Sequence, residues 1–340
     1  MKSLKDMLAG FNRGPTDLVG LDIGSSGTKA VRMRLTSGVP TVVAAGILPP
    51  VAAPTSEATY APLTLPLRLR ARYAAIAASA PGAVIKLLSF PGAFDERAES
   101  KLADSMGLDD PKGYRIGYKM LTEGHGRGES RVLAVAWQEA QACLAPQLLP
   151  TGIPAPYSLE VSGLATLTAF LHSLPEKERN SPTGLIDFGE NTTTYALQNR
   201  GVLFLLRRFN FGSNMLLEKV QNSLGVDRET AQGIVSDGSF DISQSLNDVL
   251  DPLLKQFMVS RDFVERRENC RITKLYMAGS LARSRDAAEE IHAAMDVELE
   301  TWNVLPGLTV ARDAIPAELQ GQEWRLAAAA GACLGAFEEA

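Results

Sequence analysis

The sequence predicts an α/β protein built from two similar lobes, because two hairpin motifs of one design occur in different halves of the chain. The first motif, VGLDIGSSGTKAVR (residues 19–32), is an apolar strand that ends at an aspartate and enters a glycine- and serine-rich turn. The second, TGLIDFGENTTTYALQ (residues 183–198), repeats the strand, the aspartate, the glycine turn and the hydroxyl side chains. With 340 residues, 45% of them hydrophobic, the chain is long enough to give each lobe its own core.

The first hairpin has the composition of a phosphate-binding turn. Gly24 and Gly27 lack a Cβ atom, so the backbone can turn sharply and bring its N–H groups close to an anion. Lys29 can place a positive charge on a phosphate oxygen, and Asp22 is suited to hold Mg²⁺ through water. The hydroxyls of three more residues are candidate donors: Ser25, Ser26 and Thr28. The alternative interpretation is an ordinary β-hairpin with a Gly-rich turn, since both flanking segments favour strands.

The second hairpin offers the matching half of the site. Asp187 corresponds to Asp22 and is the second candidate for holding Mg²⁺ through water, and Gly189 lies in the turn. The candidate phosphate donors that follow are Asn191, Thr192 and Thr193. We expect Asp22 and Asp187 to face each other across one cleft.

Duplicated lobes with a nucleotide between them are the layout of the actin/Hsp70-like ATPase superfamily, which this chain resembles. Within it the chain is similar to the PilM family of type IV pilus assembly and, more distantly, to the division protein FtsA. The resemblance continues, in the same order, through residues 84–107, 131–170, 201–220 and 274–305. It implies two lobes of duplicated ribonuclease-H-like topology with a small inserted subdomain of the FtsA/PilM type.

The same resemblance implies the domain boundaries. An N-terminal amphipathic segment (1–15) precedes a first lobe in two parts (16–83 and 154–182), which flank the inserted subdomain (84–153). The second lobe spans 183–307, and a C-terminal segment with a helix (308–340) returns to the first lobe. Small residues in that last helix permit close approach of backbones, which favours packing over a mobile tail.

Local patterns predict the elements between the motifs. Apolar residues at helical spacing predict a helix over 67–80, and a proline-rich stretch (49–66) predicts an extended surface connection. A long helical stretch over 242–268 is expected to break near Pro252. Other predicted helices are 96–106, 138–149, 214–224 and one that Asp227 caps and that runs to about Val235; predicted strands are 115–121 and 131–136.

The N-terminal thirteen residues have an amphipathic pattern. Five apolar residues share one helical face: Met1, Leu4, Met7, Leu8 and Phe11. Lys2, Lys5 and Arg13 outnumber Asp6 on the other face, which is typical of a peripheral membrane contact. The alternatives are a helix packed on its own domain and a frayed terminus.

Composition excludes several function classes. The net charge of −5 provides no basic surface for nucleic acid. Cys143, Cys270 and Cys333 lack the spacing of metal ligands and are expected to be thiols in a reducing compartment. The sequence contains neither a stretch of membrane-spanning length nor a cleavable signal peptide, so we expect a cytoplasmic protein at the inner face of the membrane.

The site residues depart from the family pattern in ways that weaken catalysis. Relatives carry an acidic residue that orients water two positions after the one aligned with Glu160, and here Ser162 takes its place, so no catalytic residue is assigned. The glycine pairs that approach adenosine are reduced to Gly212-Ser213 and to Ala278, Gly279 and Ser280. Gln232 and Val235 replace charged contacts to ribose and adenine, each worth roughly 1.5 to 3 kcal/mol. We expect weakly bound ATP or ADP with Mg²⁺ and at most weak hydrolysis.

The resemblance also implies a partner. The family scaffold binds the N-terminal cytoplasmic peptide of a PilN-like membrane protein, in a groove between the inserted subdomain and the first lobe. The alternative for this subdomain is a plain packing role. The alternatives for the whole chain are a cytoplasmic actin-like component of a type II secretion system and a small-molecule kinase of the same superfamily, although no Asp or Glu is clearly placed as the kinase base.

Overall fold

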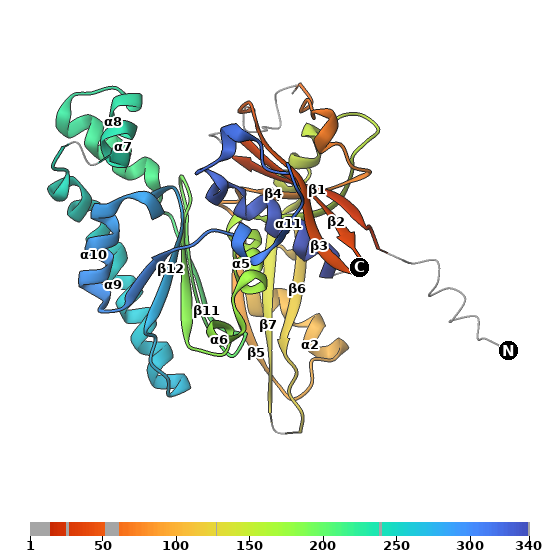
Figure 1. Ribbon diagram of the computed structural model, residues 1–340. Coiled ribbons are helices and arrows are strands. Elements are labelled where there is room, and N and C mark those ends of the chain that lie inside the picture. Colours follow the sequence, from red (N-terminus) through yellow and green to blue (C-terminus); the bar gives the residue numbers. More distant parts are fainter. Residues whose placement is uncertain (1–13, 25–26, 52–60, 127, 238–239, 339–340) are drawn as a thin grey trace. The chain divides into compact units, whose positions relative to one another are not determined.

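The computed structural model describes residues 14–24, 27–51, 61–126, 128–237 and 240–338 (Figure 1). These residues form two compact units. Unit 1 takes in the chain up to Ser79, Cys143–Ser173 and the chain from Val304, and unit 2 takes in Ala80–Ala142 and Leu174–Asn303. The predictions for residues 1–13, Ser25 and Ser26 lie outside the described residues.

Unit 1 is built on a six-stranded sheet with the strand order β14-β3-β2-β1-β4-β8. The strands are β1 (Asp17–Gly24), β2 (Gly27–Thr36), β3 (Val39–Leu48), β4 (Tyr73–Ala78), β8 (Ala155–Val161) and β14 (Thr309–Val310). The first three form an antiparallel meander, and β4 and β8 continue the sheet parallel to β1. Helix α11 (Ala327–Glu338) packs on β1 and against α5 (Ser162–Ser173).

The close packing of α11 depends on residues without side-chain bulk. A Cβ atom on Gly331 would lie 1.7 Å from the Ala165 carbonyl oxygen of α5, and one on Gly20 would lie 1.9 Å from the Ala329 carbonyl oxygen. The residues from Ala327 to Ala336 are all buried. The small residues therefore let the helix backbone touch both the sheet and its neighbouring helix.

The predicted helix over residues 67–80 is wrong. Leu67–Leu69 forms a single 3-10 turn, and Tyr73–Ala78 is the strand β4. This strand lies between β1 and β8, and five of its six residues are buried. A strand covered on both faces reads as a continuous apolar run, which the helical spacing imitates.

Unit 2 contains a sheet whose topology repeats that of unit 1. Its order, β11-β10-β9-β12-β13, is again an antiparallel meander followed by two parallel strands. The strands are β9 (Thr183–Phe188), β10 (Thr193–Asn199), β11 (Val202–Phe209), β12 (Lys274–Gly279) and β13 (Glu298–Thr301). The helices are α6 (Glu176–Arg179), α7 (Ser213–Leu224), α8 (Arg228–Asp237), α9 (Ser243–Glu268) and α10 (Arg285–Met295). One apolar core joins this sheet to α7, α8, α9 and α10.

Unit 2 also holds a small three-stranded sheet in the order β5-β7-β6. Its strands are β5 (Val84–Pro91), β6 (Tyr114–Thr122) and β7 (Glu129–Gln138), and its helices are α2 (Glu96–Ser100), α3 (Leu102–Met106) and α4 (Glu139–Ala142). Arg131 of β7 joins it to the rest of the unit through an ion pair with Glu268 (3.1 Å) and contact with the Phe204 ring. Arg208 of β11 donates to the carbonyls of Ala80 (3.0 Å) and Ala83 (3.4 Å), just before β5.

Most predicted helices of this region are present, with three differences. The helix over 214–224 is confirmed, and the Asp227 carboxylate accepts from the Thr230 N–H at 2.8 Å as a cap. The break at Pro252 is wrong, because α9 continues through it while Leu250, Leu253 and Leu254 are buried around it. The predicted helix 96–106 is interrupted at Lys101, and 138–149 divides into α4 and a 3-10 turn, Ala145–Leu148, that contains Pro146.

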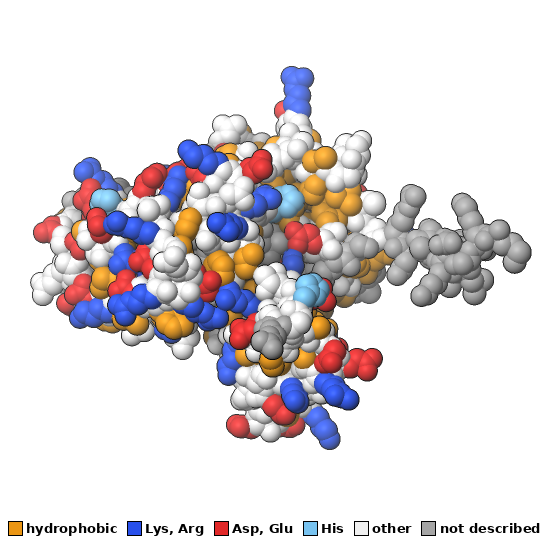
Figure 2. Space-filling model, turned by 90° about the horizontal axis from the view of Figure 1, so that it is seen from below, with side chains coloured by type: hydrophobic (Ala, Val, Ile, Leu, Met, Phe, Trp, Pro, Cys, Tyr) orange, Lys and Arg blue, Asp and Glu red, His pale blue; other side chains and the backbone are white. Residues whose placement is uncertain are grey.

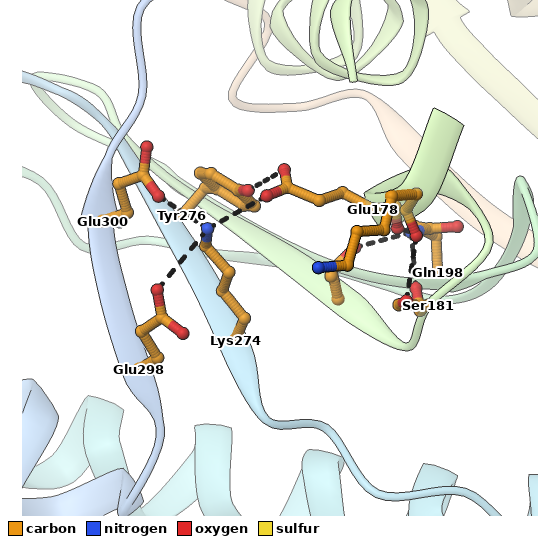
Figure 3. A network of polar contacts seen from close by, with 9 residues as sticks. Glu178, Ser181, Gln198, Lys274, Tyr276, Glu298 and Glu300 are labelled. Carbon is orange, nitrogen blue, oxygen red and sulfur yellow. Dashed lines mark hydrogen bonds and ion pairs between the residues drawn. The ribbon is translucent and has the colours of Figure 1, made fainter. Parts of the chain in front are cut away.

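A polar network fixes the amino-terminal end of β12 (Figure 3). The Lys274 ammonium contacts Glu178 of α6 (3.1 Å), Glu298 (3.5 Å) and Glu300 (2.6 Å). Tyr276 donates to the Glu178 carboxylate, and this hydrogen bond, followed by those from Lys274, lowers the pKa of Glu178 below its usual range against the effect of burial. The network therefore attaches α6 to the sheet.

The face of the molecule in Figure 2 carries Lys and Arg side chains interspersed with Asp and Glu. Within the described ranges, no helix combines the length and the apolar character that crossing a bilayer requires.

Candidate functional site

The first hairpin places its charged residues opposite each other. In the β1–β2 register, Asp22 lies across from Lys29 and Gly24 across from Gly27. A Cβ atom on Gly24 would lie 3.2 Å from Lys29 Nζ, so the ammonium group lies beside the turn. A carboxylate and an ammonium therefore flank the end of this hairpin, as a phosphate and a magnesium ion would require.

Thr28 is a buried residue of the first hairpin. Its side chain is completely buried, and its hydroxyl has no hydrogen-bond partner among the described residues. Burial removes this hydroxyl from solvent. That this hydroxyl donates to a phosphate stays a prediction.

Ser162 contacts the first hairpin directly. It is the first residue of α5, immediately after β8, and its hydroxyl donates to Asp22 Oδ1 at 2.8 Å. Glu160 lies against α11 instead, since a Cβ on Gly335 would lie 2.4 Å from Glu160 Oε1. The Ser162 group that contacts Asp22 is a hydroxyl, which can hold water but is a poor base near neutral pH.

The second hairpin is a tighter structure. Asp187 lies opposite Thr194, and the Gly189 N–H donates to the Thr192 carbonyl at 3.0 Å. A Cβ on Gly189 would lie 2.8 Å from that carbonyl oxygen, so the turn requires glycine. The Thr193 side chain is buried and its hydroxyl donates to the Phe211 carbonyl at 2.9 Å. The prediction that Thr193 presents its hydroxyl to phosphate is wrong, because the backbone of the next segment uses it.

The predicted adenosine-side residues meet the second hairpin. A Cβ on Gly212 would lie 2.2 Å from the Glu190 carbonyl oxygen, and one on Gly279 would lie 2.1 Å from the Phe188 carbonyl oxygen. Gly279 has a φ of 81°, and the adjacent Ser280 hydroxyl donates to the same Phe188 carbonyl at 3.1 Å. The structure thus gathers Gly212, Gly279 and Ser280 around the end of β9, where open α/β sheets bind ligands.

The amino terminus of α7 is part of the same assembly. The N–H groups of Ser213 and Asn214 donate to the carbonyls of Gly189 (3.1 Å) and Glu190 (3.0 Å). Asn214 Nδ2 donates to Asn191 Oδ1 at 2.8 Å, and Arg228 of α8 donates to Asn214 Oδ1. Asn214 and Arg228 are residues that sequence reasoning missed, because Asn191 lies 23 residues from Asn214, Asn214 lies 14 residues from Arg228, and no local pattern marks either pairing.

Comparison with known proteins identifies the family. The family profile "Type IV pilus assembly protein PilM" matches residues 158–337, which is more than half of the chain. The chain belongs to the PilM family. The sequence-based resemblance to this family is confirmed.

Solved structures show the fold. The structure named "PilM-PilN type IV pilus biogenesis complex" is 20% identical with a TM-score of 0.75, and the match covers 95% of this chain and 99% of that one. The predicted actin-like ATPase fold is therefore confirmed. A more distant match is the ethanolamine utilization protein EutJ from Carboxydothermus hydrogenoformans, with 14% identity and a TM-score of 0.44 over 95% of this chain and 90% of that one. Another is MreB 5 of Spiroplasma citri bound to AMPPNP, with 12% identity and a TM-score of 0.44 over 85% of this chain and 92% of that one. A search of curated proteins finds no match.

The two positions at which the sequence predicts lost ribose and adenine contacts, Gln232 and Val235, lie on α8. Gln232 is exposed, whereas Val235 packs against the core of unit 2. An apolar side chain held in a core provides no hydrogen bond to a ribose or a base.

The carboxylates predicted for magnesium lie at equivalent strand ends, Asp22 on β1 and Asp187 on β9. Among the residues that the structure describes, no group of three or more His, Cys, Asp or Glu side chains could hold a metal ion. A magnesium ion would accordingly be held by single carboxylates through water and by the phosphates. That the two carboxylates face each other stays a prediction.

Proposed function

We propose that this chain is a cytoplasmic actin-like scaffold of a type IV pilus inner-membrane assembly complex, with weak nucleotide binding and little or no hydrolysis. Membership of the PilM family supports the pilus role. The observation that carries the weak-hydrolysis part is the Ser162 hydroxyl on Asp22 Oδ1, because a hydroxyl can hold water but is a poor base near neutral pH.

The nucleotide would be held mainly from its phosphate side. Lys29 beside Gly24 supplies charge, and Asp22 and Asp187 would hold Mg²⁺ through water. Gly189, Asn191, Thr192, Gly212, Gly279 and Ser280 supply the second surface for ATP or ADP. On the base side, Gln232 and Val235 offer no charged contact, so we expect binding in the millimolar range, roughly −4 kcal/mol.

The partner would be the N-terminal cytoplasmic peptide of a PilN-like membrane protein. The similar solved structure is named as a PilM–PilN complex, which supports a PilN-like partner for this chain. An extended peptide can bind by pairing with a free strand edge and placing side chains on alternate anchors. This complex would hold the scaffold at the inner face of the cytoplasmic membrane.

Strand β6 has the features of such a peptide-binding edge. It is the terminal strand of the β5-β7-β6 sheet, so one row of its backbone groups has no strand partner among the described residues. Ile116, Tyr118 and Met120 alternate along it and are 36%, 43% and 36% exposed. Three exposed apolar side chains at alternate positions suit an extended peptide that places apolar side chains at every second residue.

A peptide titration tests the proposal. We expect the double variant Ile116→Ser/Tyr118→Ser to bind the PilN-like peptide about tenfold more weakly than the parent, which should bind with micromolar affinity. The matched control, Val259→Ser/Phe263→Ser, removes two comparably exposed apolar side chains from α9 and should bind within twofold of the parent. Equal affinities for both variants, or no binding by the parent, would contradict the proposal.

A further inference from the structure

Residues 65–72, LPLRLRAR, form an unusual surface on unit 1. Leu69 and Ala71 are buried, whereas the alternate residues Arg68, Arg70 and Arg72 are exposed. Leu67 precedes them and is 79% exposed, the largest value among the large hydrophobic residues that the structure describes. Three guanidinium groups and one projecting leucine thus share one short segment, which we call the arginine edge (Leu67, Arg68, Arg70 and Arg72).

The guanidinium groups of the arginine edge contact uncharged groups, namely backbone carbonyls and an aromatic ring. Arg68 Nη2 donates to the Ala314 carbonyl at 2.8 Å, and Arg70 Nε donates to the Leu65 carbonyl at 3.0 Å. The Arg72 guanidinium lies over the Tyr73 ring, 5.3 Å from its centroid. Across the described ranges, none of the three forms an ion pair with a carboxylate. No carboxylate of the described residues therefore neutralises their charge.

The arginine edge lies at the amino-terminal end of β1. Arg32, opposite Val19 in the β1–β2 register, donates to the Arg68 carbonyl at 3.4 Å, and Tyr73 pairs with Leu18. Asp17, the carboxylate at this end, is already shared by Arg32 (2.6 Å) and Arg34 (2.9 Å). On the neighbouring loop, the charges of Arg312 and Asp313 offset each other.

The location separates this surface from the phosphate hairpin. The Gly24 turn is at the opposite end of β1, seven residues from Asp17, or about 20 Å along a strand. Residues 1–13, with their basic and apolar sequence pattern, join the chain at the arginine-edge end.

We propose that the arginine edge is a membrane-contact surface that binds anionic phospholipid headgroups, with Leu67 entering the headgroup region. Clustered arginines are attracted to an anionic surface, and one projecting apolar side chain adds the burial that headgroups permit. An anionic bilayer can bind both the arginines and Leu67, whereas a nucleic acid would bind only the arginines. Since the whole chain has a net charge of −5, attraction would be confined to this end and would orient the protein.

Vesicle co-sedimentation of the full chain, without any partner peptide, tests this proposal. The parent should bind vesicles of phosphatidylglycerol and phosphatidylethanolamine and fail to bind phosphatidylcholine alone. Arg68→Gln/Arg70→Gln/Arg72→Gln should weaken binding roughly a hundredfold, given the contribution of each cation near an anionic surface. The matched control Arg207→Gln/Lys255→Gln/Arg266→Gln removes the same charge from exposed positions of unit 2 and should retain parental binding.

Two further measurements keep the result interpretable if the arginine variant is destabilised. Raising the salt from 0.1 to 0.5 M should release the parent from vesicles, because screening weakens headgroup attraction. Leu67→Ser should weaken binding severalfold without changing the charge. Equal binding by the arginine variant and its control, retention at high salt, or binding of a double-stranded oligonucleotide without binding of vesicles would each overturn the proposal.

The inference is independent of peptide binding. The arginine variant should bind the PilN-like peptide with parental affinity in solution, because the substitutions are in unit 1 and the proposed peptide edge, β6, is in unit 2. Failure of the vesicle experiment would therefore leave the scaffold proposal intact.

Discussion

The two hairpins share a topology but use their polar groups differently. At the β1–β2 turn, a lysine, an aspartate and a serine hydroxyl gather, and a Cβ on Gly24 would lie 3.2 Å from the end of the Lys29 side chain and 3.7 Å from the Gly27 carbonyl oxygen. At the β9–β10 turn, Thr193 and Ser280 donate to backbone carbonyls, and α7 begins on the turn itself. The first hairpin therefore brings charged and hydroxyl side chains together, whereas the hydroxyls of Thr193 and Ser280 at the second hairpin stabilise the backbone.

This difference assigns separate physical roles to equivalent strand ends. Loss of the Lys29 side chain at the first turn should act on nucleotide binding, and loss of the Thr193 or Ser280 hydroxyl at the second turn should act on stability. The predictions below test that division, beginning with the largest expected effect.

Glycine substitutions should separate the hairpins most clearly. Gly279→Ala should lower the free energy of unfolding by about 3 kcal/mol or more, because Gly279 has a φ of 81° and its Cβ would lie 2.1 Å from a backbone oxygen. Gly24→Ala, with Lys29 Nζ at 3.2 Å as its nearest neighbour, should cost less than about 1 kcal/mol. Urea denaturation of both variants provides the comparison. Equal losses would show that the second turn is no more constrained than the first.

For nucleotide affinity, the larger effect should come from a side-chain substitution in the first hairpin, in contrast to the stability effects of the glycine substitutions. Lys29→Gln should weaken Mg-ATP binding by a factor of about ten to a hundred, the range for a hydrogen bond to a charged group. Thr193→Val should leave affinity within twofold while costing about 1 kcal/mol of stability, since its hydroxyl binds Phe211. Ligand-observed NMR titration at millimolar nucleotide measures both. Unchanged affinity in Lys29→Gln would remove the phosphate role of the first hairpin.

The contribution of Glu178, at the opposite end of the second sheet, to the free energy of unfolding should depend on pH. The pKa of Glu178 is lowered in the folded protein, first by the hydrogen bond from Tyr276 and then by those from Lys274, so its contribution is complete above the unfolded pKa and is lost as the pH falls through the folded value. Glu178→Gln should therefore cost about 1 kcal/mol at pH 7 and less below about pH 4.5. Stability curves from pH 3 to 7 test this. A difference that stays constant over that range would show that the carboxylate charge does not matter.

The smallest effects should come from the two serine hydroxyls. Ser162→Ala removes the hydrogen bond to Asp22 and should change the magnesium dependence of nucleotide binding by a factor of about two to five. Ser280→Ala should leave that dependence unchanged and cost about 1 kcal/mol or less. Magnesium titrations at fixed ATP distinguish them, and identical titrations for the two variants would contradict the division of roles.

Local chemistry predicted the hairpins and several helices because each signal lies within a few neighbouring residues. The Asp-x-Gly turns and the Asp227 cap are of this kind. Strand β4 was missed because a buried parallel strand and a helix both read as apolar, and only its neighbours β1 and β8 decide between them.

Long-range commitments of polar groups could not be predicted. The Thr193 hydroxyl looks free in the sequence, yet its acceptor, Phe211, is 18 residues away. Pro252 should break a helix by its own chemistry, yet buried leucines on both sides keep α9 continuous. In each case, contacts with residues outside the local sequence pattern determine the conformation or the hydrogen-bond partner.

Partner binding without ATP turnover can be checked in a single experiment. The affinity of the PilN-like peptide should be determined with and without Mg-ATP, while phosphate release is followed in the same samples. We predict micromolar affinity that changes by less than about threefold, with turnover well below about 1 s⁻¹, the low end for enzymes. Turnover of about 1 s⁻¹ or more, together with peptide binding that disappears without nucleotide, would contradict the account.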